Sequence, residues 1–497
     1  MEFFLKPGKG MVDFRVVTGI LGVLLLVLGG FMLIPLLWSA YHGQEEVSGF
    51  LYSMLCCMLP GTGFLLLKPK QNKIGKREGY LIVTLGWLTM CFAAMLPYIF
   101  TQTASGFTNA FFESTSGLTT TGATIFKDIE ALPESILLWR SLTQWIGGMG
   151  IIVLTVAILP LLGVSGIELF IAEVPGPTSE KIHPRIKETA KRLWLIYVGL
   201  TVLLCLVLVF LSGMSFFDAL NHAFTTMSTG GFSTKNASIA HFNQPIQQYP
   251  IIFFMFLAGM NYIIIYLFLK GRFKRAWASD EFKTYLFAIL ALILICGGWL
   301  YAHTDTPLEG SFRDAAFQVI SIVTTTGYTT ADYTVWSNGM TMVFFFLLFT
   351  GACAGSTSGG IKVIRHLVFF KNTLLEFKRL LHPRAIIRIK IDKKIVASKT
   401  ITHILVFLLI YLVLFLIGSV IMSIILSDEH QPILTAIGSV ATSLGNIGPG
   451  IGAVGPAHNF ADIPAMGKNV LSFFMLIGRL ELFTVLIIFT PYFWKTN

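Results

Sequence analysis

Long apolar runs alternate with short polar, glycine-containing loops along almost the whole chain. Two apolar runs come first, near 16–41 and 47–67, and each is long enough to cross the hydrocarbon core of a bilayer. The first run is too long for a cleavable signal peptide, and no small-residue cleavage site follows it. After residue 78 one unit recurs four times: an apolar span, a short segment, a polar loop and a second apolar span.

The four units predict a helix–pore loop–helix architecture. The first spans lie near 79–101, 191–213, 283–303 and 400–426, and the second spans lie near 136–163, 247–270, 337–370 and 469–494. The pattern therefore predicts an all-α polytopic membrane protein with ten crossings and four pseudo-symmetric repeats around a central pore. The expected boundaries are 1–78 for two extra N-terminal helices and 79–190, 191–282, 283–398 and 399–497 for the repeats.

The short segments align without gaps at 109–124, 218–233, 314–329 and 435–450. One alanine column and one glycine column are invariant: Ala110, Ala219, Ala315 and Ala436, and Gly122, Gly231, Gly327 and Gly448. Each copy opens on a residue type that caps helix N-termini: Asn109, Asp218, Asp314 and Thr435. We expect a short capped helix that runs into a hydroxyl-rich loop. Four unrelated Gly/Thr loops are the alternative, which the ungapped alignment disfavours.

Such a helix is too short to cross a bilayer, and its loop is too polar to face lipid. Polar, non-helical backbone at membrane depth persists only where it is packed in protein or lines a water-filled path. Four equivalent loops therefore predict a ring whose backbone carbonyls replace the hydration shell of a cation. Glycine suits this ring because it takes positive φ at little cost.

The expected cation site is a filter made by the end of each loop. The two residues before each glycine would coordinate the ion: Thr120 and Thr121, Thr229 and Gly230, Thr325 and Thr326, and Asn446 and Ile447. The glycines themselves would supply the turn: Gly122, Gly231, Gly327 and Gly448. The fourth copy lacks the threonines, so we expect its loop to be wider and selectivity over sodium to be weaker than in a symmetric channel.

Composition and charge placement support a membrane location. The chain is 54% hydrophobic and 12% charged, with a mean hydropathy of +0.74, which excludes a soluble globular protein. All but six of the 36 Lys and Arg fall in segments expected to share one face, whereas the loops of the other face are acidic. Cytoplasmic loops carry such a positive excess, so both termini are expected in the cytoplasm, with all four loops entering from outside. A nucleic-acid partner is not needed to explain the net charge of +10.

The second span of the third repeat is interrupted by GACAGSTSGG, residues 351–360. This run is too flexible and polar for a continuous lipid-facing helix. One interpretation is close helix packing by small residues. The other is an intramembrane loop that crosses the permeation path below the filter. Its candidate residues are Gly351, Ala352, Gly355, Ser356, Thr357, Ser358, Gly359 and Gly360.

Arg479 lies well inside the last apolar span. An intramembrane cation is costly and usually faces a cavity or a partner, so Arg479 is a functional candidate. A structural salt bridge to another helix is the alternative. A simple pair with Glu481 is disfavoured, because residues two apart point to different faces of a helix. Lys127 and Lys235 follow filter loops and could anchor them through acidic neighbours.

In their order, TTTGAT, STGGFST, TTTGYT and LGNIGPGIG resemble the four half-filters of the Trk/Ktr/HKT superfamily of potassium transporters, most closely its bacterial TrkH/TrkG branch. The resemblance covers nearly the whole chain, including the two extra N-terminal helices. It implies potassium uptake across the bacterial inner membrane, with the loop at 351–360 acting as a gate that Arg479 meets near the pore axis. It also implies a homodimer and a separate cytoplasmic TrkA-like nucleotide-binding subunit, since no cytoplasmic stretch here is long enough for such a domain. No covalently bound cofactor is expected, and K⁺ is the transported ion.

Two other function classes remain open. A proton- or sodium-coupled potassium symporter would need a titratable group near the filter, and Glu113 is the only acidic residue inside a pore segment after its opening position. A membrane-embedded enzyme would need clustered intramembrane His, Asp or Glu, which the sequence lacks; His222 is expected to be a packed or hydrogen-bonded residue, and the six cysteines are expected to pack.

Two motifs are misleading or ambiguous. GIGAVG at 450–455 matches a dinucleotide fingerprint, but no strand precedes it, so we expect it to continue the fourth loop. The alternating run at 384–396 predicts a short cytoplasmic strand, an interfacial helix or a plain linker, and it is a candidate contact for a cytoplasmic partner.

Overall fold

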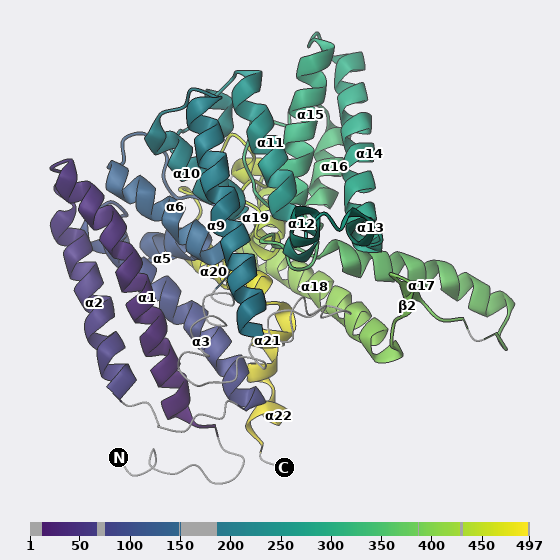
Figure 1. Cartoon of the computed structure of the whole chain (residues 1–497), viewed down its shortest axis with the longest axis horizontal. Coiled ribbons are helices and arrows are strands. Elements are labelled where there is room, and N and C mark those ends of the chain that lie inside the picture. Colours follow the sequence, from purple (N-terminus) through teal and green to yellow (C-terminus); the bar gives the residue numbers. More distant parts are fainter. Residues whose placement is uncertain are drawn as a thin grey trace.

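The computed structural model describes residues 12–66, 75–148, 150, 186–385, 387–427 and 431–495. Within them, six helices are long and apolar enough to cross a membrane, or eight if each of two bent pairs is one span. The chain is thus an all-α polytopic membrane protein, as the sequence predicts (Figure 1). Parts of the basic segments before residue 12, at 67–74 and at 178–185, the far end of the span 136–163 and the acidic pair at 428–429 lie outside the described residues.

The two N-terminal helices form a hairpin at one side of the molecule. They are α1 (Phe14–Tyr41) and α2 (Val47–Leu66), and α1 also packs against the first repeat through α3. Glycines allow the close approach: a Cβ at Gly22 would lie 2.7 Å from the carbonyl oxygen of Gly61. Five of the six cysteines are buried, in line with a packing role, whereas Cys56 on α2 is exposed.

Each repeat contributes a first span, a pore helix and the start of a second span. The first spans are α3 (Lys76–Ala94) with α4 (Leu96–Phe100), α9 (Ile186–Phe210), α14 (Asp280–His303) and α18 (Ser398–Ile425). The pore helices are α5 (Gly106–Leu118), α10 (Phe216–Met227), α15 (Leu308–Val323) and α19 (Pro432–Gly445). The second spans begin with α6 (Glu134–Gly148), α11 (Pro245–Gly259), α16 (Asn338–Leu347) and α20 (Ala465–Arg479).

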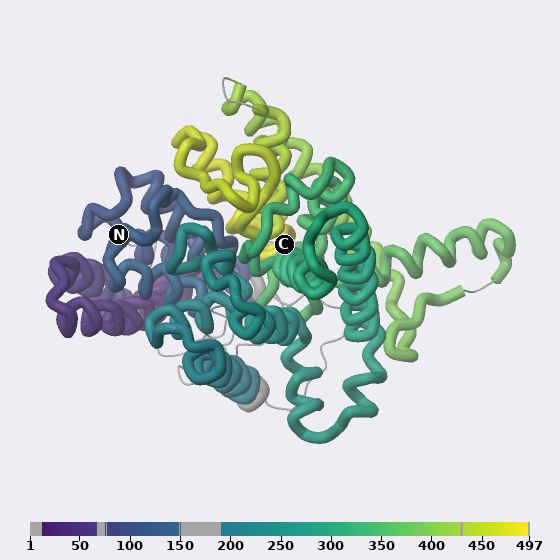
Figure 2. The backbone as a smooth tube through the Cα atoms, turned by 90° about the horizontal axis from the view of Figure 1, so that it is seen from above, coloured from purple at the N-terminus to yellow at the C-terminus, as the bar shows by residue number. Residues whose placement is uncertain are grey.

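The repeats follow one another around a common centre. Seen from above in Figure 2, the chain passes from blue through teal and green to yellow around the middle of the molecule. Contacts between repeats agree with this order, because α6 packs against α10, α11 against α15 and α20 against α5. The last repeat therefore meets the first, which closes the ring.

The pore helices start earlier than the sequence predicts, so the expected N-caps are wrong. The residues that flank the helix starts are Ser105, Ser215, Pro307 and Gln431. Asn109, Asp218, Asp314 and Thr435 lie inside the helices, where three of them bind other segments instead. Asn109 accepts from Lys468, Asp218 from Thr234, and Thr435 from the N–H of Ala453. A short polar side chain can serve either purpose, which is why residue type alone placed the caps too late.

Two second spans that the sequence predicts as continuous are sharply bent. In the second repeat α11 meets α12 (Tyr262–Leu269) at 108°, and in the fourth α20 meets α21 (Leu482–Leu486) with η4 (Ile487–Phe489) at 111°. Asn261 caps the start of α12 by accepting from the N–H of Ile263 at 2.9 Å, and Glu481 takes a φ of +62° between α20 and α21. Each of these local signals is a single residue inside an apolar run that is long enough to span the membrane. The hydropathy of the run therefore still predicts one continuous helix. The break in the third repeat, between α16 and α17 (Val363–Leu381), lies where the sequence places it.

The remaining elements are short. They are η2 (Ser238–His241), α13 (Phe273–Trp277), β1 (Lys390–Ile391), β2 (Lys394–Ile395), η3 (Gly452–Val454) and α22 (Pro491–Trp494). The ambiguous run at 384–396 thus contains a two-stranded antiparallel hairpin. Residues 450–455 form a 3-10 turn after the fourth loop rather than a dinucleotide motif.

The start of the described chain and its end lie at the same end of the molecule. The N–H of Asp13 donates to Glu78 at the start of α3 at 3.2 Å, and Arg77 binds the carbonyl of Lys495 after α22. This arrangement agrees with an even number of crossings between them.

Candidate functional site

The four filter loops share one backbone conformation. Their first residues all lie in the left-handed region, with φ of 54° for Thr120, 54° for Thr229, 58° for Thr325 and 53° for Asn446. A left-handed threonine is strained, since L-residues other than glycine, asparagine and aspartate rarely adopt it. The same strained residue in three copies, with asparagine in the fourth, is a shared feature of the ring and not a local accident.

Each left-handed residue ends its pore helix in the same way. The N–H of the left-handed residue donates to the carbonyl three residues earlier, and the next N–H donates to the carbonyl five residues earlier. In the first repeat these bonds are Thr120 to Gly117 at 3.0 Å and Thr121 to Ser116 at 2.9 Å; in the fourth they are Asn446 to Ser443 at 3.4 Å and Ile447 to Thr442 at 2.9 Å. This pair of hydrogen bonds is the Schellman motif, and it directs the C-terminal end of every pore helix at the ring.

Contacts between the glycines and the neighbouring loops close the ring. A Cβ at Gly122 would clash with the carbonyl oxygen of Gly230, and a Cβ at Gly231 would clash with that of Thr326. A Cβ at Gly327 would lie 2.8 Å from the nitrogen of Gly448, and one at Gly448 would lie 3.0 Å from the carbonyl oxygen of Gly122. Loops one, two, three, four and one again are therefore in direct backbone contact.

The fourth loop departs from the other three. Gly122, Gly231 and Gly327 have φ of 83°, 79° and 79°, whereas Gly448 lies outside the left-handed region. The expectation that all four glycines supply the same turn is wrong at this position. The reason is Pro449, because a residue before proline is restricted to extended conformations.

The side chain of Asn446 ties the fourth loop to the first. Its Nδ2 donates to Thr121 Oγ1 at 3.1 Å and to the carbonyl of Met475 in α20 at 2.8 Å. Asparagine is suited to this position because it tolerates the left-handed conformation and carries two side-chain N–H groups. The amide thus replaces threonine without loss of contact to the ring.

A cavity of about 80 Å³ lies on one side of the ring. All four repeats line it, with Gly122, Gly231, Gly327 and Gly448 at its base and segments that follow the loops around it. Some of those segments are joined across repeats: Lys127 pairs with Asp462 at 2.6 Å, and Asn236 Nδ2 donates to Asp128 at 2.9 Å. The bond from Asn236, with two further backbone bonds, lowers the pKa of the Asp128 carboxyl below its usual value. Lys235 also has an acidic neighbour, Asp218, at 4.0 Å.

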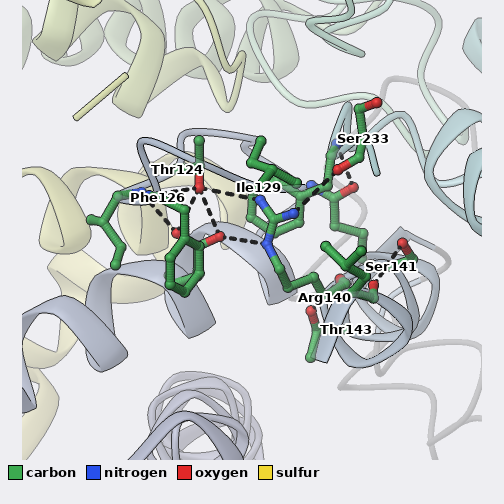
Figure 3. Close-up of polar contacts among 12 residues, drawn as sticks. Thr124, Phe126, Ile129, Arg140, Ser141, Thr143 and Ser233 are labelled. Atoms are coloured by element: carbon green, nitrogen blue, oxygen red, sulfur yellow. Dashed lines mark hydrogen bonds and ion pairs between the residues drawn. The ribbon is translucent and has the colours of Figure 1, made fainter. Parts of the chain in front are cut away.

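A buried ion pair between Arg140 and Glu113 contacts the segments that follow loops one and two. Arg140 on α6 and Glu113 on α5 are joined at 2.9 Å, and their side chains are 1% and 0% exposed. Figure 3 shows the guanidinium of Arg140 between Thr124 and Ser233, to which it donates at 3.2 Å each. Arg140 therefore links the ends of filter loops one and two. Arg140 was not among the residues predicted from the sequence to have a role, although the sequence shows both an acid inside a pore helix and a cation in the next span.

The segment 351–360 lies on the other side of the ring, directly against it. The N–H of Gly359 donates to Thr325 Oγ1 at 2.7 Å, and Thr357 Oγ1 lies 3.3 Å from Thr229 Oγ1. A Cβ at Gly359 would lie 2.7 Å from the Cβ of Asn446. Three of the four left-handed residues thus contact this segment.

The segment is a closed loop with its two ends side by side. The N–H of Gly351 donates to Ile361 at 2.8 Å, and that of Val363 donates to Ala352 at 3.1 Å. Inside the loop, the hydroxyls of Ser356 and Ser358 lie 2.8 Å apart. Gly355 and Gly360 take φ of 73° and 64°, and the carbonyl of Gly355 accepts from the N–H of Tyr262 at the start of α12 at 3.2 Å. The bend in the second repeat therefore brings α12 against this loop.

Arg479 joins this loop to α6. Its Nη1 donates to the carbonyl of Thr357 at 2.8 Å, and its Nη2 donates to the carbonyls of Gly147 and Gly148 at 2.5 and 3.0 Å. The latter two carbonyls belong to α6. Arg479 is the last residue of α20, so the bend in the fourth repeat aims it at the loop.

Glu481 pairs with Arg365 on α17 at 2.5 Å, and these side chains are 14% and 5% exposed. Arg365 also stacks over the ring of Phe407, with its guanidinium carbon 3.8 Å from the centroid. Sequence spacing excluded a pair with Arg479 but gave no means of finding Arg365, which is distant along the chain. An ion pair therefore joins two breaks. Arg365 is near the start of α17, which follows the break in the third repeat, and Glu481 lies in the break between α20 and α21.

Comparison with known proteins places these features in a family. Residues 46–296 and 301–495 match the family model for TrkH, described as a cation transport protein. The chain is 41% identical over 490 residues to the Trk system potassium uptake protein TrkH of Salmonella typhimurium, covering 97% of this chain and 99% of that protein. It is 40% identical over 489 residues to TrkH of Escherichia coli, with the same coverage.

A solved structure agrees with the fold. The crystal structure of the potassium transporter TrkH from Vibrio parahaemolyticus matches 97% of this chain and 100% of that chain, with a TM-score of 0.86 and 35% sequence identity. The resemblance inferred from the four loop motifs is confirmed, and the chain belongs to the TrkH family of cation transport proteins.

Proposed function

We propose that this protein takes up potassium across the bacterial inner membrane through a pore on the axis of the four-loop ring. The ion is coordinated by main-chain oxygens of the two residues before each filter glycine: Thr120 and Thr121, Thr229 and Gly230, Thr325 and Thr326, and Asn446 and Ile447. Relatives of 40 and 41% identity carry the name potassium uptake protein, which supports the choice of ion.

The observation that carries the proposal is the closed ring of four loops with the same left-handed first residue. Pore helices that end at the ring place the negative ends of four helix dipoles there, which favours a cation. Main-chain oxygens suit a monovalent ion that must both enter and leave, whereas a divalent ion would be held by carboxylates. The acid nearest the loops, Glu113, is already paired with Arg140.

The loop at 351–360 is the gate in this proposal. It contacts Thr229, Thr325 and Asn446 on the side of the ring away from the cavity, so an ion leaving the filter on that side would meet it. Arg479 would hold the gate shut through the carbonyl of Thr357 and would add a positive charge below the filter. Opening would require this contact to break.

Orientation and partners follow from charge and family. The cavity side, with acidic Asp128 and Asp462 near it, would face the outside, and both termini would lie in the cytoplasm. A homodimer and a TrkA-like nucleotide-binding subunit that opens the gate complete the proposal, on the strength of the family resemblance alone.

A proton- or sodium-coupled symporter is the second candidate, because Glu113 lies beside the first loop. The contacts of Glu113 disfavour it: the carboxylate binds Arg140, the hydroxyl of Thr124 and the N–H of Ile125. All these partners give the side chain of Glu113 a structural role. Uptake whose pH dependence changes on Glu113→Gln would favour the symporter.

The deciding experiment is single-channel recording of the purified protein in planar bilayers under opposed potassium and sodium gradients. A reversal potential that follows the potassium gradient is expected. A reversal potential that ignores the potassium gradient, in recordings with clear channel activity, would refute the selective pore.

A further inference from the structure

The fifth position of each aligned pore segment is polar in all four repeats. It holds Glu113, His222, Gln318 and Ser439. All four side chains are buried, with 0% exposure. Since an unpaired buried polar group is costly, each of these side chains needs a partner.

In the first repeat the partner is the segment that follows the filter glycine. Thr124 Oγ1 donates to both carboxylate oxygens of Glu113, at 3.0 and 3.1 Å, and the N–H of Ile125 donates to Oε2 at 2.9 Å. The pore helix therefore holds, through one side chain, the end of its own loop that follows the glycine. We call this end the outer end of the loop.

The second repeat makes the same connection with different chemistry. His222 Nδ1 lies 2.7 Å from the carbonyl of Asp218, which can only accept, so Nδ1 carries the proton. Nε2 is then free to accept from Ser233 Oγ at 2.9 Å. Ser233 occupies the aligned position of Thr124, so helix and loop are joined at equivalent points.

The third repeat is similar and the fourth is different. Gln318 Nε2 donates to Thr330 Oγ1 at 3.3 Å, one position further along the loop. Ser439 Oγ instead donates at 3.0 Å to the carbonyl of Ala436 in its own helix. The outer end of the fourth loop is held from the third repeat, because Tyr333 Oη donates to the carbonyl of Gly450 at 2.8 Å.

Arg140 joins the first two of these connections into one unit. It pairs with Glu113 and donates to Thr124 Oγ1 and to the carbonyl of Ser233. Its guanidinium carbon also lies 4.2 Å from the ring centroid of Phe232 in loop two. A charge pair excluded from water is strong and poorly compressible, so it fixes the spacing between loops one and two.

We propose that Glu113, His222 and Gln318 are positioning residues that fix the outer ends of filter loops one to three, and that the Glu113–Arg140 pair sets the ring width between loops one and two and hence the discrimination of potassium from sodium. The inference rests on the proposed function, because it needs the ring to be the ion filter. It assigns selectivity to side chains that never touch the ion. Rigid carbonyl positions matter because a sodium ion is smaller and is favoured by a ring that can contract.

The test is the potassium to sodium permeability ratio from reversal potentials of the full-length protein and its variants. Glu113→Gln removes the charge, His222→Phe keeps a ring but removes Nε2, and Ser233→Ala removes only the hydroxyl that donates to His222. Each is expected to lower the ratio by about threefold or more, on the order of one lost hydrogen bond. The matched control is Ser439→Ala, at the same alignment position but with its bond inside its own helix, and it is expected to keep the ratio of the unmodified protein.

Melting temperature separates positioning from simple stability. If the variants melt at lower temperature but keep the ratio, their role is structural only and the inference is wrong. Should Glu113→Gln fail to fold, Thr124→Val decides for the Glu113–Arg140 pair, since it deletes only the hydroxyl that binds both side chains. Ser233→Ala decides for His222 in the same way. An unmodified protein that does not distinguish potassium from sodium overturns the proposed filter itself, whereas a selective protein with unchanged variants overturns only this inference.

Discussion

Arg479 donates a hydrogen bond from Nη1 to the main-chain carbonyl of Thr357 at 2.8 Å, and so connects the last residue of α20 to the loop at 351–360. The same guanidinium binds the carbonyls of Gly147 and Gly148 in α6. One side chain thus holds together the first, third and fourth repeats. Any movement of the loop away from the ring must break a charge-assisted bond or carry α20 with it.

Arg479→Ala is therefore expected to raise basal potassium flux. Of the three bonds that the charged guanidinium donates, the one to the carbonyl of Thr357 holds the loop. Such a bond is worth about 1.5–3 kcal/mol, so the closed loop should lose that much of its advantage over an open one. Flux into liposomes that contain the purified variant, without a regulatory subunit, measures the effect, and an increase of about tenfold is expected even at the lower end of that range. Arg379→Ala is the control, because Arg379 pairs with Glu376 on the exposed part of α17. Equal flux for both variants would contradict the gate.

Gly359→Ala tests the fit between the loop and the ring. A Cβ at Gly359 would lie 2.6 Å from the carbonyl oxygen of Gly445 and 2.7 Å from the Cβ of Asn446, so the loop cannot seat fully. Basal flux should rise while the ring itself is intact, and the permeability ratio should stay that of the unmodified protein. The control is Gly298→Ala in α14, where nothing lies within 4 Å of the added carbon.

Gly231→Ala tests the ring. The residue has φ of 79°, and an added Cβ would overlap the carbonyl oxygen of Thr326, so loops two and three must separate. We expect loss of potassium preference, with a permeability ratio near that of free diffusion, or loss of conduction altogether. Reversal potentials and flux measure the two outcomes, and Gly298→Ala serves again as the control. A selective, conducting Gly231→Ala variant would mean that the two loops are not neighbours in the working protein.

Repeat and hydropathy signals in the sequence predict most of the architecture. The four loops, the two N-terminal helices and the break at 351–360 are local in sequence: each is a run of residue types whose physical preference does not depend on distant partners. The alignment also identified Gly122 and its three counterparts, and the structure brings all four together. Gly448 was expected to turn like the others, but the effect of Pro449 on the preceding residue overrides the alignment.

The missed features depend on partners far apart in sequence. Arg140 meets Glu113 and Ser233, and Arg365 meets Glu481, only because the ring has closed. The bends at Asn261 and Glu481 were missed for a related reason. The apolar run continues on both sides of each bend, so hydropathy alone predicts a continuous span. Tertiary contacts with the loop at 351–360 also contribute to the bends. A single sequence shows that an intramembrane charge needs a partner but not which partner it has.

A double-mutant cycle on Arg365 and Glu481 tests whether the two breaks are mechanically joined. The pair is 2.5 Å long and mostly buried, so removing one partner leaves a charge in a poorly solvated place, at a cost of about 3 kcal/mol. Arg365→Met and Glu481→Gln should each lower the melting temperature, and the double variant should melt above the temperature that additive effects predict. Additive effects would mean that the pair is not coupled.

Basal flux provides the second readout for the same variants. Glu481 lies two residues after Arg479, and α17, which carries Arg365, starts just after the loop at 351–360. The ion pair therefore helps to position both partners of the bond between Arg479 and Thr357. Each single variant should therefore raise flux, by less than Arg479→Ala because the bond to Thr357 remains. Lower stability with unchanged flux would show that the pair supports the fold but has no part in closing the pore.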